Sequence, residues 1–267
     1  MDLNKYISKA ASEQDMTKIQ VRDAQSTYTP PPPGVAMLRL VGYIECGKHK
    51  DSYQGQETIK NKVKIVFELH GKNYPTRDVG GHKVPYRLTI SENLSLHEKS
   101  NFRKLFEMMR AGDTDIKHFS QMLGKPFIGK VFNEKSKTDQ TKVYAKLRDA
   151  SGYYIGPAIQ EDPVSGEVRR INVPEALSPL RLFLWDFADK EMWDNIYIDG
   201  QYGNVFQDYI KQAINFKGSR TDKLLNGTLD SIDQLDNLAD QLIEKKRTGF
   251  SQHLHDNGFD DMFPEDE

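Results

Sequence analysis

The chain has 267 residues, a formal net charge of -2 and a mean hydropathy of -0.69. No run approaches the roughly 20 apolar residues of a membrane span, and no apolar segment follows the polar N-terminus, so neither an anchor nor a secretory signal is expected. A single cysteine, Cys46, excludes an internal disulfide and fits a reducing cytoplasm. These features predict one large domain, or one domain with appendages.

The charge is divided unevenly along the chain. Residues 219–267 carry 12 acidic against 5 basic residues, whereas the preceding 218 residues carry 32 basic against 27 acidic residues. A block of like charge at a terminus is typical of an interaction tail. We therefore expect a mildly basic body and a strongly acidic tail.

Residues 1–34 are expected to form an N-terminal arm or linker, because the lead-in Pro30–Pro33 cannot pair into a sheet. Residues 35–50 then predict one long strand, with a bulge or sharp bend at Gly42. A bent first strand suits a small closed barrel, since the bend lets it serve both halves. The side chains expected toward the core are Leu38, Leu40, Ile44 and Cys46, and those expected outside are Arg39, Val41, Tyr43 and Glu45.

Four further strands are predicted by alternation of apolar and polar residues. They are Lys62–His70, Tyr86–Ile90, Phe127–Asn133 and Lys142–Asp149. Between the second and third of these, Ser95 and Glu98 have capping-box spacing, which predicts a helix that Gly112 ends. Three strands, a helix and two strands is the order of an OB-fold, a five-stranded Greek-key barrel. The expected fold class is therefore mainly β, an OB-fold barrel with one helix between strands three and four.

The remaining chain is expected to be attached to this barrel. Residues 150–218 are expected to extend the barrel and to form one domain with it at 35–218. Within them we expect short strands or loops at 179–187 and 193–198 and a short helix near 207–216. Residues 219–267 predict an amphipathic helix near 229–242 followed by a disordered acidic tail.

Cations interleaved with aromatics on one strand face suit a single-stranded nucleic acid, because cations follow the phosphates and aromatic rings stack on unpaired bases. The alternative is a solvated strand face that merely alternates charge with tyrosine. In the fifth strand all four outward positions fit, which favours binding, and Tyr153 and Tyr154 follow it. The predicted nucleic-acid-binding residues are Arg39, Tyr43, Lys48, Lys50, Lys64, Arg87, Lys130, Lys142, Tyr144, Lys146, Arg148 and Tyr153.

The last twelve residues carry six acids around aromatic and apolar side chains, a pattern suited to docking in a basic, apolar groove. Such a tail could also occupy the chain's own cationic groove, and the alternative is a merely disordered terminus. The predicted partner-binding residues are Phe259, Asp260, Asp261, Met262, Phe263 and Pro264.

Features that could indicate an enzyme are weak. His253 and His255 could ligate a metal, but they lie in the expected tail. The Gly80–His82 segment lacks the Lys-Ser/Thr pair of a phosphate loop. Acids such as Asp186 and Asp194 are spaced like ordinary surface residues. We expect no catalytic residue, no metal and no cofactor.

The chain resembles the OB-fold single-stranded DNA-binding proteins encoded by bacteriophages. The stretches that carry the resemblance are 37–42, 91–104, 123–126 and the acidic tail. The resemblance implies a non-enzymatic protein that coats and protects single-stranded DNA during phage replication, recombination and repair in the cytoplasm of the infected host. It also implies that the tail recruits replication proteins such as a polymerase or a helicase-primase.

The tail departs from the acidic tails that end in an apolar residue, because Glu265, Asp266 and Glu267 follow Pro264. Docking on host repair enzymes that clamp a terminal phenylalanine is therefore not expected. A strand-annealing recombination mediator or a polymerase accessory protein on the same fold is the main alternative, and a nuclease or a purely structural protein are others. A homo-oligomer is possible in each case.

Overall fold

The structure is a computed structural model that describes residues 29–53, 56–79, 81–136, 139–162, 164–198 and 204–228. The first half of the domain contains β1 (Gly34–Tyr53), β2 (Gln56–His70), β3 (Arg77–Val79), β4 (His82–Val84), β5 (Tyr86–Asn93), α2 (Asn101–Arg110), the 3-10 helix η1 (Phe119–Met122) and β6 (Pro126–Lys135). The second half contains β7 (Val143–Lys146), β8 (Arg148–Asp149), β9 (Gly152–Tyr153), β10 (Ile155–Pro157), β11 (Ile159–Glu161), β12 (Val168–Arg170), β13 (Arg181–Phe183), the 3-10 helix η2 (Trp185–Phe187), α3 (Lys190–Asn195), α4 (Val205–Lys211) and α5 (Arg220–Leu225).

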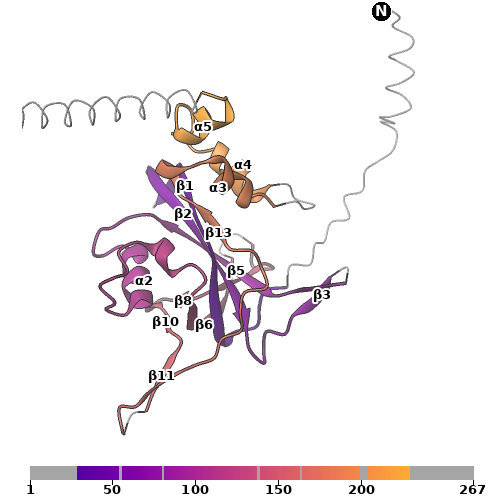
Figure 1. Cartoon of the computed structure of the whole chain (residues 1–267), viewed down its shortest axis with the longest axis vertical. Coiled ribbons are helices and arrows are strands. Elements are labelled where there is room, and N and C mark those ends of the chain that lie inside the picture. The colour runs from indigo at the N-terminus through magenta and orange to yellow at the C-terminus, as the bar shows by residue number, and fades with distance from the viewer. Residues whose placement is uncertain are drawn as a thin grey trace, which may run out of the picture. The chain divides into compact units, whose positions relative to one another are not determined.

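The long antiparallel pair of β1 and β2 is the centre of the sheet (Figure 1). One edge of β1 pairs with β2 over nearly its whole length. The opposite edge is shared, because β6 pairs antiparallel with residues 34–39 and β13 pairs parallel with residues 42–44. The expected long first strand is confirmed, and it organises three neighbouring strands.

A bulge in β1 changes which side chains face which side of the sheet. The register with β2 shifts between Leu40 and Gly42, as expected from the glycine. Beyond the bulge, Tyr43 joins Leu38 and Leu40 in a first core, while Ile44 lies in a second core on the opposite face. The expected sides of Tyr43 and Ile44, and of Cys46, are therefore wrong, because a one-residue shift inverts the alternation.

The first core lies between the sheet and α2. Phe102, Leu105, Phe106 and Met109 form the buried face of α2 and pack in this core with Phe119 of η1. The start of this helix is corrected by the structure. Ser100, not Ser95, is the N-cap, since its side chain accepts a hydrogen bond from Arg103 N at 3.1 Å.

The second core lies under the C-terminal extension, whose helices α3, α4 and α5 gather near one end of β1 and β2 (Figure 1). Phe183, Trp193, Ile196, Phe206 and Ile210 pack there against the outer face of β1. The expectation of strands or loops at 193–198 is wrong in part, because residues 193–195 belong to α3. Asp189 caps the first turn of this helix.

The described domain also continues past residue 218. Ser219 caps α5 through Asp222 N, and Arg220 Nε donates a hydrogen bond to the Ala188 carbonyl at 2.8 Å. The predicted amphipathic helix at 229–242 and the acidic tail lie outside the described residues, as does nearly all of the N-terminal arm.

The sheet is mainly antiparallel and is not closed into a barrel. Its hydrogen-bonded order is β10-β6-β1-β2-β5, with β7 on β6 and β13 on β1. Within the described residues no ladder joins β5 to β7. Side chains instead bridge β5 to the β8–β9 hairpin that follows β7, because the Glu92 carboxylate accepts a hydrogen bond from the Tyr153 hydroxyl at 2.5 Å and lies 3.3 Å from Arg148 Nη1. The mainly β class is confirmed, whereas the expected closed barrel is not observed. No helix in the described parts of the chain is long and apolar enough to cross a membrane.

We predict that Gly47→Ala destabilises the domain strongly. Gly47 has a φ of 77°, and a Cβ there would lie 2.3 Å from the Trp185 ring of η2. Left-handed strain and overpacking together should remove about 2–4 kcal/mol from the free energy of unfolding. The measurement is urea unfolding of the full chain.

Gly112→Ala is the matched control, because Gly112 has a φ of 81° but no atom within 4 Å of the added Cβ. It should cost only the backbone strain, about 1 kcal/mol. Equal losses in the two variants would show that the contact between Gly47 and Trp185 does not hold η2 on β1.

Candidate nucleic-acid interface

The residues predicted to bind nucleic acid do not share one face. Some are buried in the sheet, some are exposed but scattered, and a group on β6 and β7 lies together. Their placement follows from the two cores, because the outer face of β1 is covered by the chain segment and helices after residue 170.

Arg39 is buried, with 6 % of its surface exposed. Its guanidinium donates to the carbonyls of Val173 at 2.6 Å, Pro174 at 2.8 Å and Gly124 at 2.8 Å, and lies 3.3 Å from Glu175 Oε1. Every one of these partners belongs to the chain itself. The prediction that Arg39 faces outward to bind phosphate is therefore wrong, because a segment distant in sequence covers it.

Glu68 lies directly opposite Arg39 in the β1–β2 ladder and holds the same covering segment. Its fully buried carboxylate accepts hydrogen bonds from the backbone N–H groups of Leu177, at 2.9 Å, and Ser178. The cation thus binds carbonyl groups of residues 173–174 and the anion binds amides of residues 177–178. We call residues 173–178 the strap.

Tyr43 is also buried, with 1 % exposed. Its ring stacks on Phe119 with 5.3 Å between centroids, and its hydroxyl donates to Glu45 Oε1 at 3.1 Å. Burial, reinforced by Glu45, raises the pKa of the Tyr43 phenol well above its usual range. Tyr43 is a core side chain and not a stacking platform for a base.

Tyr153 is 8 % exposed and is occupied by the contact with Glu92 that bridges β5 and β9. Burial and the Glu92 charge raise the pKa of its phenol, so the hydroxyl remains a donor. Arg148 lies with its guanidinium 5.7 Å from the centre of the Tyr153 ring and pairs with Glu92. The expected outward tyrosine at 153 is therefore wrong, while Arg148 remains half-exposed.

Four of the predicted cations lie on the β1–β2–β5 part of the sheet, and each of them has different surroundings. Lys48 is exposed, Lys50 pairs with Glu57 at 3.4 Å, and Lys64 lies 4.6 Å from the centre of the Tyr209 ring of α4. Arg87 is exposed on β5. Burial of Arg181 lowers its pKa, and the positive charge of Arg87 lowers it further. Of these four cations, only Lys64 lies over an aromatic ring of the described residues.

The outer face of β6 and β7 gathers cations and aromatic rings. Phe132 pairs with Lys146 in the ladder, and Tyr144 pairs with Glu134. Opposite residues in an antiparallel pair lie on the same face. Tyr154 adds a ring 5.2 Å from Phe132, and Lys130 Nζ lies 5.1 Å from the Phe132 centre. We call Lys130, Phe132, Tyr144, Lys146 and Tyr154 the aromatic–lysine face.

The aromatic–lysine face is open to a ligand. Tyr144 is 47 % and Tyr154 is 41 % exposed, and Lys130 is exposed. Lys146 is half-buried and bonds Glu134, so its charge is shared with one acid of the same face. Lys142 lies at the adjoining loop and pairs with Asp139 at 3.3 Å. Phe132 was missed by the sequence reasoning, although its separation of two residues from Lys130 would place both on one strand face.

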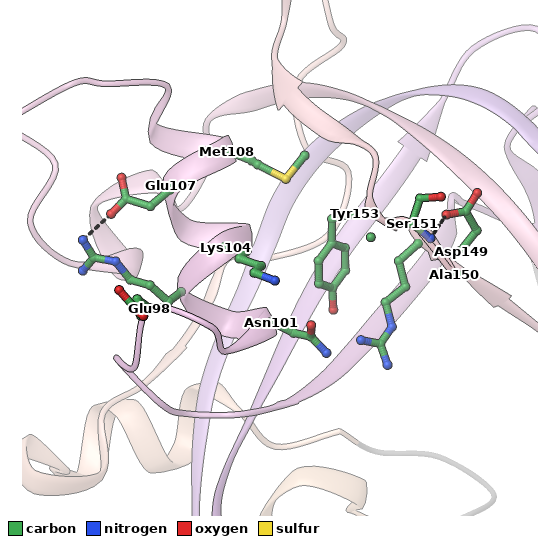
Figure 2. Close-up of a pocket in the computed structure, with 12 residues that line it drawn as sticks. Glu98, Asn101, Lys104, Glu107, Met108, Asp149, Ala150, Ser151 and Tyr153 are labelled. Carbon is green, nitrogen blue, oxygen red and sulfur yellow. Dashed lines mark hydrogen bonds and ion pairs between the residues drawn. The ribbon is translucent and has the colours of Figure 1, made fainter.

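A cavity of about 610 Å³ lies between α2 and the β8–β9 hairpin. Figure 2 shows Lys104 and Asn101 pointing from α2 toward Tyr153, while Glu107 is held away from them in an ion pair with Arg103. The charged lining is balanced. Its cations are Arg103, Lys104 and Arg148, and its acids are Glu98, Glu107 and Asp149. We therefore expect this lining to attract a polyanion less strongly than the aromatic–lysine face does.

The described residues contain no group of three or more His, Cys, Asp or Glu side chains that could hold a metal ion. Asp186, Asp189 and Asp194 lie around η2 and α3, where Asp189 caps α3 and Asp194 pairs with Lys190 at 2.7 Å. These two acids have structural partners. The His253–His255 pair and the residues Phe259 to Pro264 lie outside the described residues.

Comparisons of the chain with known protein families, with curated proteins and with solved structures found no match in any of the three sets.

We predict that Arg39→Lys destabilises the domain and leaves any binding of oligo-dT by the folded protein unchanged. A lysine cannot reproduce the several directed N–H donors of the guanidinium, so buried strap carbonyls lose partners. The free energy of unfolding should fall by about 2–4 kcal/mol. Urea unfolding measures this, and oligo-dT titration below the unfolding transition measures binding.

Arg87→Lys is the matched control, because Arg87 is an exposed arginine on β5, opposite Glu68 in the β2–β5 ladder. Its stability should change by no more than about 0.5 kcal/mol. A folded Arg39→Lys protein that loses affinity for oligo-dT while Arg87→Lys does not would restore Arg39 as a binding residue.

Proposed function

We propose that the chain binds single-stranded DNA across the aromatic–lysine face of β6 and β7. The observation that carries the proposal is the register of Phe132 with Lys146, beside exposed Tyr144 and Tyr154. Alternating rings and ammonium groups match the alternation of bases and phosphates along a single strand. The spacing is set by backbone pairing and not by flexible loops.

Single strands fit this face better than a duplex. The rings of Tyr144 and Tyr154 stand on a strand face, where they can stack on bases whose planes are open. A duplex hides those planes between neighbouring base pairs. The lysines supply salt-dependent attraction to phosphates and carry no sequence information. The resulting binding is broad in sequence and steep in its dependence on salt.

We propose further that the sheet is a partly open OB-fold. Its five strands would be β1, β2, β5, β6 and β7, with α2 between the third and fourth. Support comes from the pairing of β1 with both β2 and β6 and of β7 with β6. OB-folds are partly open barrels whose surface strands bind oligonucleotides. The gap between β5 and β7 is the opening that this assignment requires.

The wider role follows from the resemblance to phage proteins and from the charge division of the chain. We propose that the protein coats and protects single-stranded DNA during phage replication, recombination and repair in the host cytoplasm. Its acidic tail, with Phe259 and Phe263, would recruit a polymerase or a helicase-primase. Strand annealing would use the same face and would differ by accelerating the pairing of complementary strands.

We predict that Tyr144→Ala combined with Lys146→Ala lowers the affinity for oligo-dT at least about tenfold. One stacking contact is worth roughly 1–3 kcal/mol, and one lost phosphate contact should reduce the slope of log affinity against log salt by about 0.7. Fluorescence titration with oligo-dT across a salt series measures both quantities.

Tyr197→Ala combined with Lys190→Ala is the matched control. Tyr197 is 52 % exposed, and Lys190 pairs with Asp194 as Lys146 pairs with Glu134. This control lies on the extension and should bind as the unmodified chain does. Unchanged affinity in the Tyr144 and Lys146 variant would exclude the aromatic–lysine face, and absence of oligo-dT binding by the unmodified chain would exclude the function.

A further inference from the structure

A second cavity, of about 420 Å³, lies where the end of α2 meets the start of β6 and the base of the β11–β12 hairpin. Its lining comes from α2 and the turn after it, from η1, from β6 and from both strands of the hairpin. None of its lining residues belongs to the aromatic–lysine face. We call this cavity the hairpin pocket.

The floor of the hairpin pocket is apolar. Met109, Met122 and Phe127 line it and are buried, with 2 %, 0 % and 3 % of their surface exposed. Thioether groups adapt to the shape of a neighbour and make favourable contacts with aromatic rings. The cavity volume lies within the roughly 300–1,000 Å³ of pockets that bind small ligands. This floor therefore suits an aromatic side chain.

The rim of the hairpin pocket is cationic. Its charged lining residues are Arg110, Lys125 and Arg170 against the single acid Asp113. Arg110 is paired with Glu107 at 2.7 Å. Lys125 and Arg170 are exposed, and neither forms an ion pair with another residue that the structure describes. Guanidinium and ammonium groups bind carboxylates, so the rim favours an anionic ligand beside the apolar floor.

Residues 256–267 of the chain have the complementary chemistry. They carry six acids and no base, and acids lie within three residues of Phe263 on both sides. We infer that the hairpin pocket holds this segment of its own chain, with the Phe263 ring on the methionine floor and the neighbouring carboxylates at Lys125 and Arg170. The inference uses the charge and shape of the pocket and does not require that the chain binds DNA.

The chain is long enough to make this contact. The 27 residues from 229 to 255 separate the described domain from the segment, and extended they span up to about 90 Å. A compact domain of about 200 residues has a radius of gyration of about 16 Å. The segment can therefore reach any part of the surface of its own domain, where the tether keeps its effective concentration high.

The pocket gives the acidic segment a site apart from the proposed DNA site. The sequence suggested that the tail could occupy the chain's own cationic groove, which would place it on the DNA-binding surface. Because the hairpin pocket and the aromatic–lysine face share no residue, the segment and a DNA strand can be held at the same time. A partner that recruits through the tail would then have to draw it from the hairpin pocket.

Disulfide formation in the full chain tests the inference. The only natural cysteine, Cys46, is buried with 0 % exposed, so an introduced pair reports without interference. Ile159→Cys lies at the pocket and is 45 % exposed in the natural chain, and Met262→Cys lies beside Phe263. In oxidised glutathione this pair should form an intramolecular disulfide at least about tenfold faster than the control, because docking raises the local concentration of the two thiols.

Val164→Cys with Met262→Cys is the matched control. Val164 is five residues from Ile159 on the same hairpin, is 95 % exposed and does not line the pocket. A segment that contacts the surface at random would react faster at this more exposed position. Mass spectrometry of the products, separated by size without reductant, identifies the linked peptides and shows whether they join one chain or two.

Charge reversal tests the rim. Lys125→Glu with Arg170→Glu should slow disulfide formation between positions 159 and 262 at least about fivefold, since two carboxylate contacts become repulsive. Lys83→Glu with Arg169→Glu is the control, because both residues are exposed outside the pocket and the net charge changes equally. This control should react as the unreversed pair does.

Three results would overturn the inference. Equal rates at positions 159 and 164 would show that the segment has no preference for the pocket. Disulfides that join two chains would show that the pocket takes the segment of a second copy. Loss of the intramolecular disulfide on addition of oligo-dT would place the segment on the aromatic–lysine face. Failure to bind oligo-dT would remove the proposed function and leave the rates without oligo-dT unchanged, so the two proposals can fail separately.

Discussion

The bulge at Gly42 is the constraint on which the rest of the structure depends. By shifting the register of β1 against β2, it decides which side chains enter which core, with Leu40 and Tyr43 on one side and Ile44 on the other. A Cβ on Gly42 would lie 3.0 Å from Val66, so the two strands pack closely at this glycine. The α2 core and the core of the extension are both built on this strand.

Burial of both faces creates a polar problem that Arg39 and Glu68 solve. Covering an antiparallel sheet with irregular chain leaves carbonyl and amide groups that need partners. Arg39 supplies donors to the carbonyls of the strap, and Glu68 supplies acceptors to its amides. Each charge would be costly to bury alone, but the pair is satisfied by directed hydrogen bonds from opposite positions of one ladder. The sheet thus fixes the strap mainly through the strap's own backbone groups, to which the ion pair of Arg39 with Glu175 adds.

The sequence predicts the positions of the strands well, but it predicts poorly which side chains are exposed and which are buried. Alternation of apolar residues locates β1, β2, β5 and β6, because each has a buried side in the first core. The same alternation assigns Arg39 and Tyr43 to a solvent face, since period-two reasoning cannot see a bulge's inversion or a covering segment more than a hundred residues away. Ser95 and Ser100 each offer a helix cap, and the structure places the cap at Ser100, two residues before the buried Phe102.

The candidate site lies on other strands than expected for the same physical reason. The face of β1 and β2 that carries the extension is covered, so Arg39 on this face holds the strap instead of a ligand. The face of β6 and β7 escapes this covering because the chain turns there into the short hairpin of β8 and β9 and leaves Tyr144 and Tyr154 exposed. Only that part of the predicted surface combines exposed rings with lysines in a fixed register. The covering of β1 and β2 therefore leaves the outer face of β6 and β7 as the part of the described sheet on which a single strand could bind.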